Sequence, residues 1–312
     1  MRIAIMGSGG VGGYFGGLLA RAGHDVTFIA RGAHLAALKA HGLRVESVHG
    51  DFAITPAQTI DDPAAVGPVD YVLFATKTFQ IEEAAAAMRP MIGPQTAVLP
   101  LHNGLDASER TVAVLGAGPV LGGMCQLGSY IAAPGVIEQI SQFRRVVAGE
   151  LDGPVSPRVT AIVAALRAAG ADAEASPTIQ KARWTKFIFI APFSGIGALT
   201  RAPAGDIMGC PETRSLLVDA VLEVEAVARA AGIGLDEDIA AKTVAFCDGM
   251  APGQTASMQR DILDGKPSEL ESIVGVMVRL GAELDVPTPL FRCFYAALLP
   301  QERRARELAN GG

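Results

Sequence analysis

The chain has 312 residues, a length typical of about two domains. Half of its residues are hydrophobic, only 5% are aromatic and the net charge is −6. This composition excludes an intrinsically disordered chain, and it argues against a nucleic-acid-binding protein because phosphate contacts need an excess of basic residues. The apolar stretches are also far shorter than the ~20 residues that span a bilayer, so we expect no membrane segment.

Neither the cysteines nor the histidines form a metal-binding pattern. The four cysteines are widely spaced and contain no C-x-x-C pair, which argues against a zinc cluster or a disulfide framework. His34, His41 and His49 lack metal-ligand spacing, and we expect them at the surface or in loops. The sequence therefore predicts a reduced, cytoplasmic protein with no metal centre.

The N-terminal segment predicts a strand, a helix and a second strand. Residues 2–6 form a continuous apolar run that ends in a glycine-rich segment, as buried parallel strands do. Residues 11–22 are predicted to form a helix that ends before Gly23, and residues 25–30 a second strand. Together they predict a βαβ unit, for which a right-handed crossover is the default topology.

The alternation of strands and helices continues along the first half of the chain. We predict further strands at 70–75, 96–101 and 171–175, and helices at 81–91 and 160–169. Residues 119–124 are apolar with paired glycines. Residues 136–151, which contain VIEQIS and RRVVAGEL, have the pattern of a hairpin.

The character of the chain changes after Ser176 and Pro177, because helical periodicity replaces the alternation. We predict helices at 178–195, 211–231, 235–246, 257–263 and 268–284, then a final helix after Pro289 with a frayed end at 303–312. The sequence therefore predicts an α/β domain over residues 1–177 followed by an all-α domain over residues 178–312.

The glycine-rich segment after the first strand has the pattern G-x-G-x-x-G of a dinucleotide-binding turn. It comprises Gly7, Ser8, Gly9, Gly10, Val11 and Gly12. The first glycine allows a tight turn, the second lets the backbone approach a pyrophosphate, and the third lets the helix lie close to the strand. Since the pattern opens a helix directly after a strand, we expect a Rossmann-like domain that holds phosphate at the helix N-terminus.

The end of the second strand bears on the choice between NAD and NADP. An NAD site usually places Asp or Glu there to hold the ribose hydroxyls. Here the position is Arg31, and no acidic residue occurs from Val26 to Arg44. A guanidinium in place of a carboxylate favours a 2′-phosphate, so we predict NADPH as the cofactor.

Polar residues follow two later strands of the predicted sheet. Lys77 comes just after strand 70–75, and Asn103 comes just after strand 96–101, between His102 and Gly104. Because ligands of open α/β sheets bind beyond the carboxyl ends of the strands, we expect both residues near cofactor and substrate. The alternatives are a solvated lysine and an ordinary Asn-Gly turn.

In the helical half, Lys186 lies among strongly apolar residues in the segment RWTKFIFIAPFS. Partial burial disfavours the charged form of a lysine, which makes it a usable proton donor near neutral pH. Helical spacing places Ile190 and Ser194 on the same face, one and two turns after Lys186. The alternative is a lysine whose charged end extends into solvent.

The segment Ser268-Glu269-Leu270-Glu271 has the pattern of a capping box. In that pattern Ser268 caps a helix and Glu271 reaches back to it from the third helical position. A capping box accounts for Glu271 but not for Glu269, which we therefore expect at the interdomain site. Ser257 and Asp261 lie one helical turn apart on the preceding predicted helix.

In this order, these segments resemble the ketopantoate reductase (2-dehydropantoate 2-reductase) family over nearly the whole chain. The resemblance rests on GSGGVGG at 7–13, Arg31, the Lys77 segment, HNG at 102–104, Lys186, SM-x-x-D at 257–261 and SELESIVG…VPTP at 268–289. It implies an N-terminal Rossmann domain, a helical C-terminal domain and an active site between them. It also implies NADPH-dependent reduction of a 2-oxo acid, ketopantoate in pantothenate biosynthesis.

The resemblance implies roles for individual residues. The cofactor would be bound by Gly7, Gly9, Gly12 and Arg31. Lys77 and Asn103 would lie near the nicotinamide and the substrate. Lys186 would protonate the developing alkoxide, and Ser257 would bind the carboxylate end of the substrate. Glu269 would assist Lys186 or the substrate hydroxyl.

Three positions depart from the family pattern and make the predicted pocket more apolar. Ile190, Ser194 and Val274 stand where the family has asparagines. A substrate hydroxyl buried there without a partner costs about 1–3 kcal/mol. The sequence thus predicts a 2-oxo acid reductase, and leaves open ketopantoate, a more apolar 2-oxo acid or an imine as the substrate. A non-catalytic NADPH-binding sensor is the alternative from another class. We expect a monomer or a homodimer.

Overall fold

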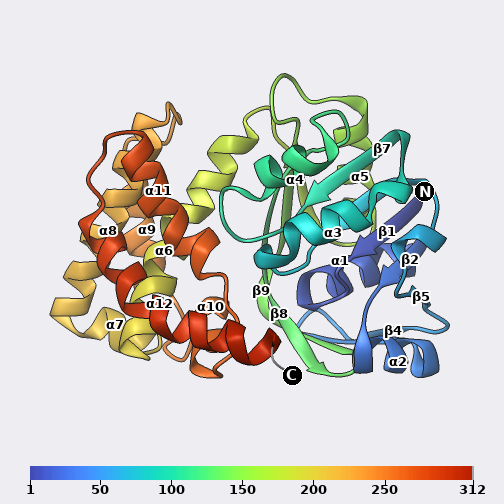
Figure 1. The fold of residues 1–312 in the computed structure, drawn as a ribbon, viewed down its shortest axis with the longest axis horizontal. Coiled ribbons are helices and arrows are strands. Elements are labelled where there is room, and N and C mark those ends of the chain that lie inside the picture. Colours follow the sequence, from blue (N-terminus) through green and yellow to red (C-terminus); the bar gives the residue numbers. More distant parts are fainter. Residues whose placement is uncertain (311–312) are drawn as a thin grey trace. The chain divides into compact units, whose positions relative to one another are not determined.

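The computed structural model describes residues 1–310, and the chain divides into two compact units. The first unit comprises Met1–His102 and Ala107–Ile179, in blue to green in Figure 1. The second comprises Asn103–Asp106 and the chain from Gln180 onward, most of it in yellow to red. The short segment Asn103–Asp106 therefore groups with the second unit, although its neighbours in the sequence belong to the first.

A parallel sheet forms the centre of the first unit (Figure 1). Its strands in spatial order are β5 (Gln58–Ile60), β2 (Asp25–Ile29), β1 (Arg2–Met6), β6 (Val69–Phe74) and β7 (Ile92–Pro100). Strand β1 is apolar after its first residue because helices cover both faces of the sheet. Ile3 and Ile5 pack with residues of α1 (Gly10–Arg21), whereas Ala4 and Met6 pack with residues of α3 (Ile81–Ala87).

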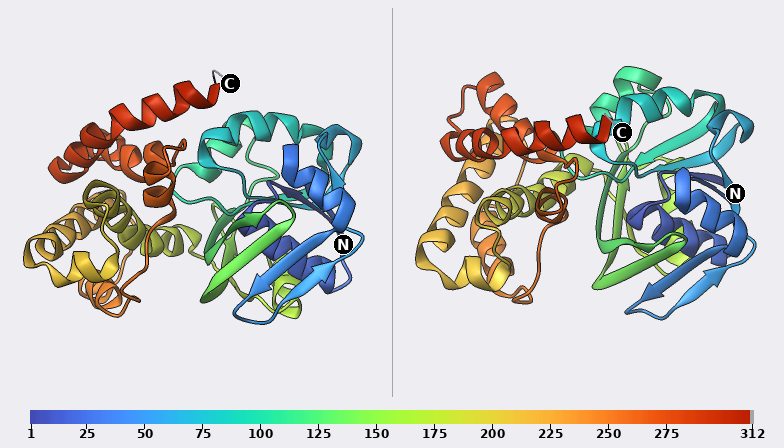
Figure 2. Two further views of the ribbon diagram at one scale, coloured as in Figure 1. Left: turned by 90° about the horizontal axis from the view of Figure 1, so that it is seen from below. Right: turned by 60° about the horizontal axis from the view of Figure 1, so that its bottom comes forward.

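A second sheet adjoins the first in this unit, and the sequence predicted only part of it. Its strands are β10 (Asp172–Ala175), β9 (Val136–Gly149), β3 (Leu43–Ser47) and β4 (Phe52–Ile54), and β8 (Gly122–Ala133) pairs with β9. Figure 2 shows β8 and β9 as a long green hairpin. The prediction of a hairpin within residues 136–151 is wrong, because both predicted arms belong to β9 and the turn precedes them at Pro134 and Gly135.

The helices of the first unit are α1, α2 (Gly32–His41), α3, α4 (Ala107–Leu115) and α5 (Pro157–Ala168). The sequence predicted neither α2 nor α4. The predicted helix 81–91 is shorter in the structure, since α3 ends at Ala87 and a 3₁₀ turn follows at Arg89–Met91. Pro90 accounts for the change, because a proline disfavours helical backbone in the residue before it.

The described part of the second unit is helical. Its helices are α6 (Ile179–Thr200), α7 (Ala204–Gly209), α8 (Pro211–Ala230), α9 (Ile239–Asp248), α10 (Ser257–Leu263), α11 (Val276–Glu283) and α12 (Pro289–Asn310), with a π turn at Glu271–Gly275. Apolar side chains of α6, among them Trp184 and Phe187, pack in one core with those of the other helices. The predicted fold class, an α/β part followed by an all-α part, is confirmed.

The end of the chain is more regular than the sequence predicted. Helix α12 continues to Asn310, so the expectation of a frayed end is wrong for residues 303–310, and residues 311–312 lie outside the described part. Among residues 1–310, no helix combines the length and the hydropathy needed to cross a bilayer.

Candidate functional site

The glycine-rich turn after β1 has the geometry that its sequence predicts. Gly7 has φ +99°, and a Cβ there would lie 2.7 Å from the backbone nitrogen of Thr76. A Cβ on Gly12 would lie 2.1 Å from the carbonyl oxygen of Gly7, so only glycine lets α1 approach the turn this closely. A Cβ on Gly9 would meet no described atom within 4 Å. The backbone at Gly9 is therefore open to a phosphate group.

The turn offers backbone donors rather than side chains. Helix α1 begins at Gly10, and no described side chain caps its N-terminus, so its first N–H groups are available to an anion. The Ser8 hydroxyl points inward and donates to the carbonyl oxygen of Ile29 at 2.9 Å. Val11 packs against the apolar core of the first unit. Of the predicted motif residues, Ser8 and Val11 therefore have structural side chains.

His34 supports this turn from α2, so it lies in a helix and is half-buried, where the sequence predicted a surface or loop residue. The half-buried ring has its Nε2 2.9 Å from the carbonyl oxygen of Ser8, and its Nδ1 accepts from the N–H of Gly135 at 3.1 Å. Because a carbonyl only accepts and a backbone N–H only donates, the ring is neutral with its proton on Nε2. Burial lowers the pKa of His34, which favours the neutral form.

Arg31 lies two residues after the end of β2, beside the strand end where the sequence places it. Both of its Nη atoms donate to Oε1 of Glu83 in α3 at 3.2 Å. No signal near Arg31 in the sequence could reveal this partner, which lies 52 residues away. The two side chains are 64% and 69% exposed, so water and salt weaken their attraction and a phosphate can compete for Arg31.

Lys77 and His102 follow β6 and β7 in the first unit. Lys77 is half-buried at the start of a 3₁₀ turn, Thr78–Gln80. His102 is 7% exposed, and its Nε2 lies 3.2 Å from Oγ1 of Thr76. Among the described residues its Nδ1 has no hydrogen-bond partner. Burial, with a smaller contribution from Arg110, lowers the pKa of His102 to about 3, so the ring is neutral at neutral pH.

The second unit brings Lys186, Asn103 and Glu269 together. Nζ of Lys186 donates to Oδ1 of Asn103 at 2.7 Å, and Nδ2 of Asn103 donates to Oε2 of Glu269 at 3.2 Å. The end groups fix the orientation of the amide, because an ammonium only donates and a carboxylate only accepts. Glu269 is 5% exposed and Lys186 is half-buried. The carboxylate is thus linked to the ammonium through Asn103, a connection that the sequence did not predict.

The predicted capping box at Ser268–Glu271 is only partly right, since Oγ of Ser268 accepts from the N–H of Leu270 at 3.3 Å but Glu271 has other partners. The Ser268 N–H and hydroxyl donate to the carboxylate of Glu302 in α12, at 3.0 and 2.5 Å, so Ser268 is held by a residue 34 positions later. Glu302 is 2% exposed and pairs with Arg306 at 2.7 Å. Glu271 does not reach back to Ser268 but pairs with side chains of α11 and α12. The residue before Glu269 is therefore anchored by a buried carboxylate.

The other predicted pocket residues also lie in the second unit and differ in burial. Ile190 on α6 and Ser257 at the start of α10 are half-buried. Ser194 is 1% exposed, and its Oγ has no hydrogen-bond partner among the described residues. Val274 lies within the π turn and is fully buried. Solvent therefore reaches Ile190 and Ser257, whereas Ser194 and Val274 lie in the interior.

Models of one protein family match both halves of the chain. Residues 3–153 match the model of ketopantoate reductase PanE/ApbA, and residues 178–302 match the model of its C-terminal part. The chain belongs to the ketopantoate reductase family. It is therefore an oxidoreductase of that family. The predicted resemblance is confirmed.

Individual relatives cover almost the whole chain. Uncharacterized oxidoreductase YkpB of Bacillus subtilis (strain 168) is 29% identical over 298 residues, which are 96% of this chain and 98% of that protein. The crystal structure of a PanE/ApbA family ketopantoate reductase from Ralstonia eutropha JMP134 has a TM-score of 0.90 and 32% identity, covering 98% of this chain and 100% of that one.

One solved structure carries a different activity in its name. D-mandelate dehydrogenase with NADH and anilino(oxo)acetate has a TM-score of 0.89, covering 98% of this chain and 100% of that one. Its sequence identity is only 20%, so the likeness shows the shared fold alone.

Proposed function

We propose that this protein is an NADPH-dependent reductase that converts a 2-oxo acid into the corresponding 2-hydroxy acid in the cytoplasm, as a monomer or homodimer. Ketopantoate is the first candidate substrate, with pantothenate biosynthesis as its setting. The observation that carries the proposal is the hydrogen-bonded chain from Glu269 through Asn103 to Lys186. Reduction of a keto group needs hydride at carbon and a proton at oxygen, and Lys186 is the proton donor that the second unit supplies.

Lys186 stabilises and then protonates the keto oxygen as negative charge develops on it. An ammonium has three N–H donors, and the contact with Asn103 uses one of them. Glu269 accepts from Nδ2 of Asn103 and so holds the amide with its oxygen facing the ammonium, which keeps Nζ in one place. The half-buried Ser257 hydroxyl donates to the carboxylate of the substrate.

The first unit has groups that fit the cofactor. The open backbone at Gly9 and the uncapped N-terminus of α1 fit a pyrophosphate, and Arg31 fits a 2′-phosphate. Lys77, after β6, is proposed to contact the nicotinamide end. Bound NADPH supplies the hydride. The neighbour of Arg31, Glu83, fits the ribose hydroxyls of NADH instead, so the two cofactors have to be compared directly.

A more apolar 2-oxo acid is the second candidate substrate. Ile190 is half-buried and Val274 is buried, and neither offers a hydrogen bond to a substrate hydroxyl. D-mandelate dehydrogenase, solved with NADH and anilino(oxo)acetate, is an example of the same fold with a ligand that carries an aromatic ring. An imine substrate is compatible with the same proton donor. A non-catalytic NADPH sensor is disfavoured, because such a protein has no need of the Lys186–Asn103–Glu269 chain.

A substrate panel tests the proposal. NADPH oxidation is followed by absorbance with ketopantoate, with 2-oxo acids that carry branched or aromatic side chains, and with imines. We expect turnover of 2-oxo acids, and a clear preference for ketopantoate would reject the apolar alternative. Tight NADPH binding with no turnover of any compound would reject the reductase and favour the sensor.

A further inference from the structure

The segment Asn103–Asp106, here called the Asn103 loop, is fastened to the second unit at several points. Gly104 has φ +95°, and a Cβ there would lie 2.6 Å from the carbonyl oxygen of Ser272. The backbone of the loop therefore lies directly against the π turn that follows Glu269. Polar contacts from two arginines hold the loop as well.

A buried arginine holds the middle of the Asn103 loop. Arg183 is 5% exposed, and its Nη2 donates to the carbonyl oxygen of Leu105 while its Nη1 donates to Oε1 of Gln180 at 2.9 Å. Arg183 and Lys186 are three residues apart on α6, so they lie on the same side of the helix. Helix α6 thus contacts one short segment at two points, Lys186 at Asn103 and Arg183 at Leu105.

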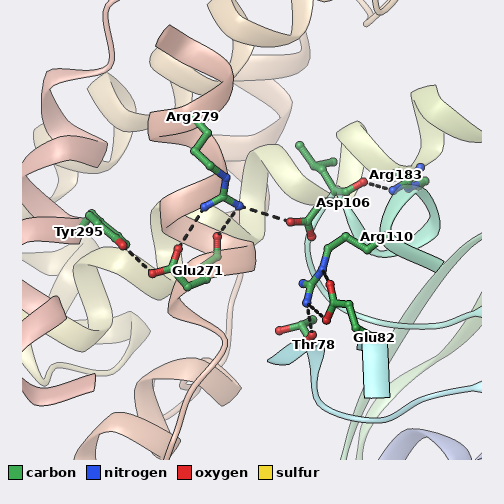
Figure 3. Close-up of polar contacts among 9 residues, drawn as sticks. Thr78, Glu82, Asp106, Arg110, Arg183, Glu271, Arg279 and Tyr295 are labelled. Atoms are coloured by element: carbon green, nitrogen blue, oxygen red, sulfur yellow. Dashed lines mark hydrogen bonds and ion pairs between the residues drawn. The ribbon is translucent and has the colours of Figure 1, made fainter. Parts of the chain in front are cut away.

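A second arginine joins the end of the Asn103 loop to the π turn (Figure 3). Arg279 of α11 donates to Oδ2 of Asp106 at 3.3 Å and to Oε2 of Glu271 at 3.0 Å. The hydroxyl of Tyr295 in α12 donates to the other oxygen of Glu271 at 2.5 Å, which fixes that carboxylate. Arg279 therefore connects a residue three positions after Asn103 to a residue two positions after Glu269.

We infer that Arg183 and Arg279 are positioning residues for the reduction, because they hold the Asn103 loop in the register that lets Asn103 bridge Lys186 and Glu269. The bridge needs the two ends of one small amide to meet two fixed partners at hydrogen-bond distance. A displacement of about 1 Å at a catalytic group can lower the rate by about a hundredfold. The inference rests on the proposed function for its effect on catalysis, but the fastening of the loop can be measured without turnover.

The first experiment uses Arg279, because its side chain is 47% exposed and its replacement leaves the core intact. Arg279→Gln is compared with Arg292→Gln, an exposed arginine of α12, as the matched control. Amide hydrogen exchange of the peptide that contains residues 103–106 is measured in the NADPH-bound protein. We expect faster exchange in Arg279→Gln and unchanged exchange in Arg292→Gln. Equal exchange in the two variants overturns the inference, whether or not the protein proves to be a reductase.

Kinetics of the same variants separate positioning from general structural damage. With the 2-oxo acid that the wild-type protein reduces best, we expect Arg279→Gln to lower kcat/KM by about tenfold and to leave NADPH affinity unchanged. Arg279→Lys keeps one charged donor and recovers part of the loss. Arg183→Lys, at the buried site, lowers kcat/KM by about a hundredfold. If the wild-type protein reduces no 2-oxo acid, the proposed function fails. The hydrogen-exchange result then decides by itself whether Arg279 holds the Asn103 loop in place. Unchanged kcat/KM in an active protein carrying Arg279→Gln contradicts the positioning role.

Discussion

The two parts of the candidate site are built in different ways. The glycine-rich turn of the first unit is contiguous in the sequence, and its properties come from space and backbone at Gly7, Gly9 and Gly12. The site of the second unit joins side chains that lie 83 and 166 residues apart, Lys186 with Asn103 and Asn103 with Glu269. The comparison predicts that added atoms disturb the turn, whereas the loss of a hydrogen bond disturbs the Lys186 site.

Loss of Asn103 tests the side-chain site in this comparison, and the replacement of Lys186 is expected to have a larger effect still. Asn103→Ala removes the acceptor from Lys186 and the donor from Glu269 at once, so we expect kcat/KM to fall by about a hundredfold. Steady-state kinetics measure the loss. Kinetics close to the wild-type values would show that the bridge is not needed.

Two glycine substitutions test the glycine-rich turn, the other site in this comparison. Gly12→Ala places a Cβ against the carbonyl of Gly7, so we expect the free energy of unfolding to fall by about 1–3 kcal/mol. Gly9→Ala places its Cβ in open space with an extended backbone that alanine adopts. We therefore expect Gly9→Ala to keep the stability and to weaken NADPH binding. Denaturant unfolding and NADPH titration are measured for both variants. Equal losses of stability in Gly12→Ala and Gly9→Ala would contradict the prediction.

The next expected effect is a dependence of the free energy of unfolding on pH, which comes from His102. His102 has a folded pKa of about 3, against an ordinary value of 6.5, so below pH 6.5 the unfolded chain takes up a proton that the folded chain does not. The neutral His102 ring therefore makes its full contribution to the free energy of unfolding above pH 6.5. This contribution falls by up to about 1.4 kcal/mol per pH unit as the pH drops toward 3. Urea unfolding at several pH values measures this slope. His102→Gln should flatten it, whereas replacing the exposed His41 should not.

The smallest expected effect concerns the cofactor phosphate. Arg31→Ala should raise the Kd for NADPH by about tenfold, the equivalent of ~1.4 kcal/mol, and leave the Kd for NADH unchanged. Glu83→Gln should tighten NADPH binding, because it removes the competitor of the phosphate. Arg44→Ala is the matched control, an exposed arginine already paired with Glu46. Equal changes for both cofactors would contradict a 2′-phosphate site at Arg31.

Much of the first unit can be predicted from local pattern. The run Arg2–Met6, the glycines and α1 are neighbours in the chain, so one window of sequence contains the strand, the turn and the helix. The same logic places Arg31 near the end of β2 but does not reach its partner Glu83, which comes from another element. It failed also for His34, whose contacts with Ser8 and Gly135 join three distant segments.

The second unit was predictable in its helices but only partly in its site. Lys186 stands out by its apolar neighbours and Asn103 by its place after a strand, yet no local pattern links them. The capping pattern at Ser268 was partly misleading because Glu302, 34 residues away, supplies the acceptor. Arg183 and Arg279 gave no signal at all, since an arginine that holds a backbone carbonyl or a surface carboxylate looks like any other in sequence.

The central claim is that Lys186 is the proton donor of an NADPH-dependent reductase, and the comparison of Lys186→Ala with Lys181→Ala tests it most directly. Lys181 lies on the same helix, is 43% exposed and pairs with Asp236. We predict that Lys186→Ala lowers kcat for the best 2-oxo acid by about a thousandfold while NADPH binding stays intact, and that Lys181→Ala changes neither. Turnover in Lys186→Ala that matches the Lys181→Ala protein would contradict the account.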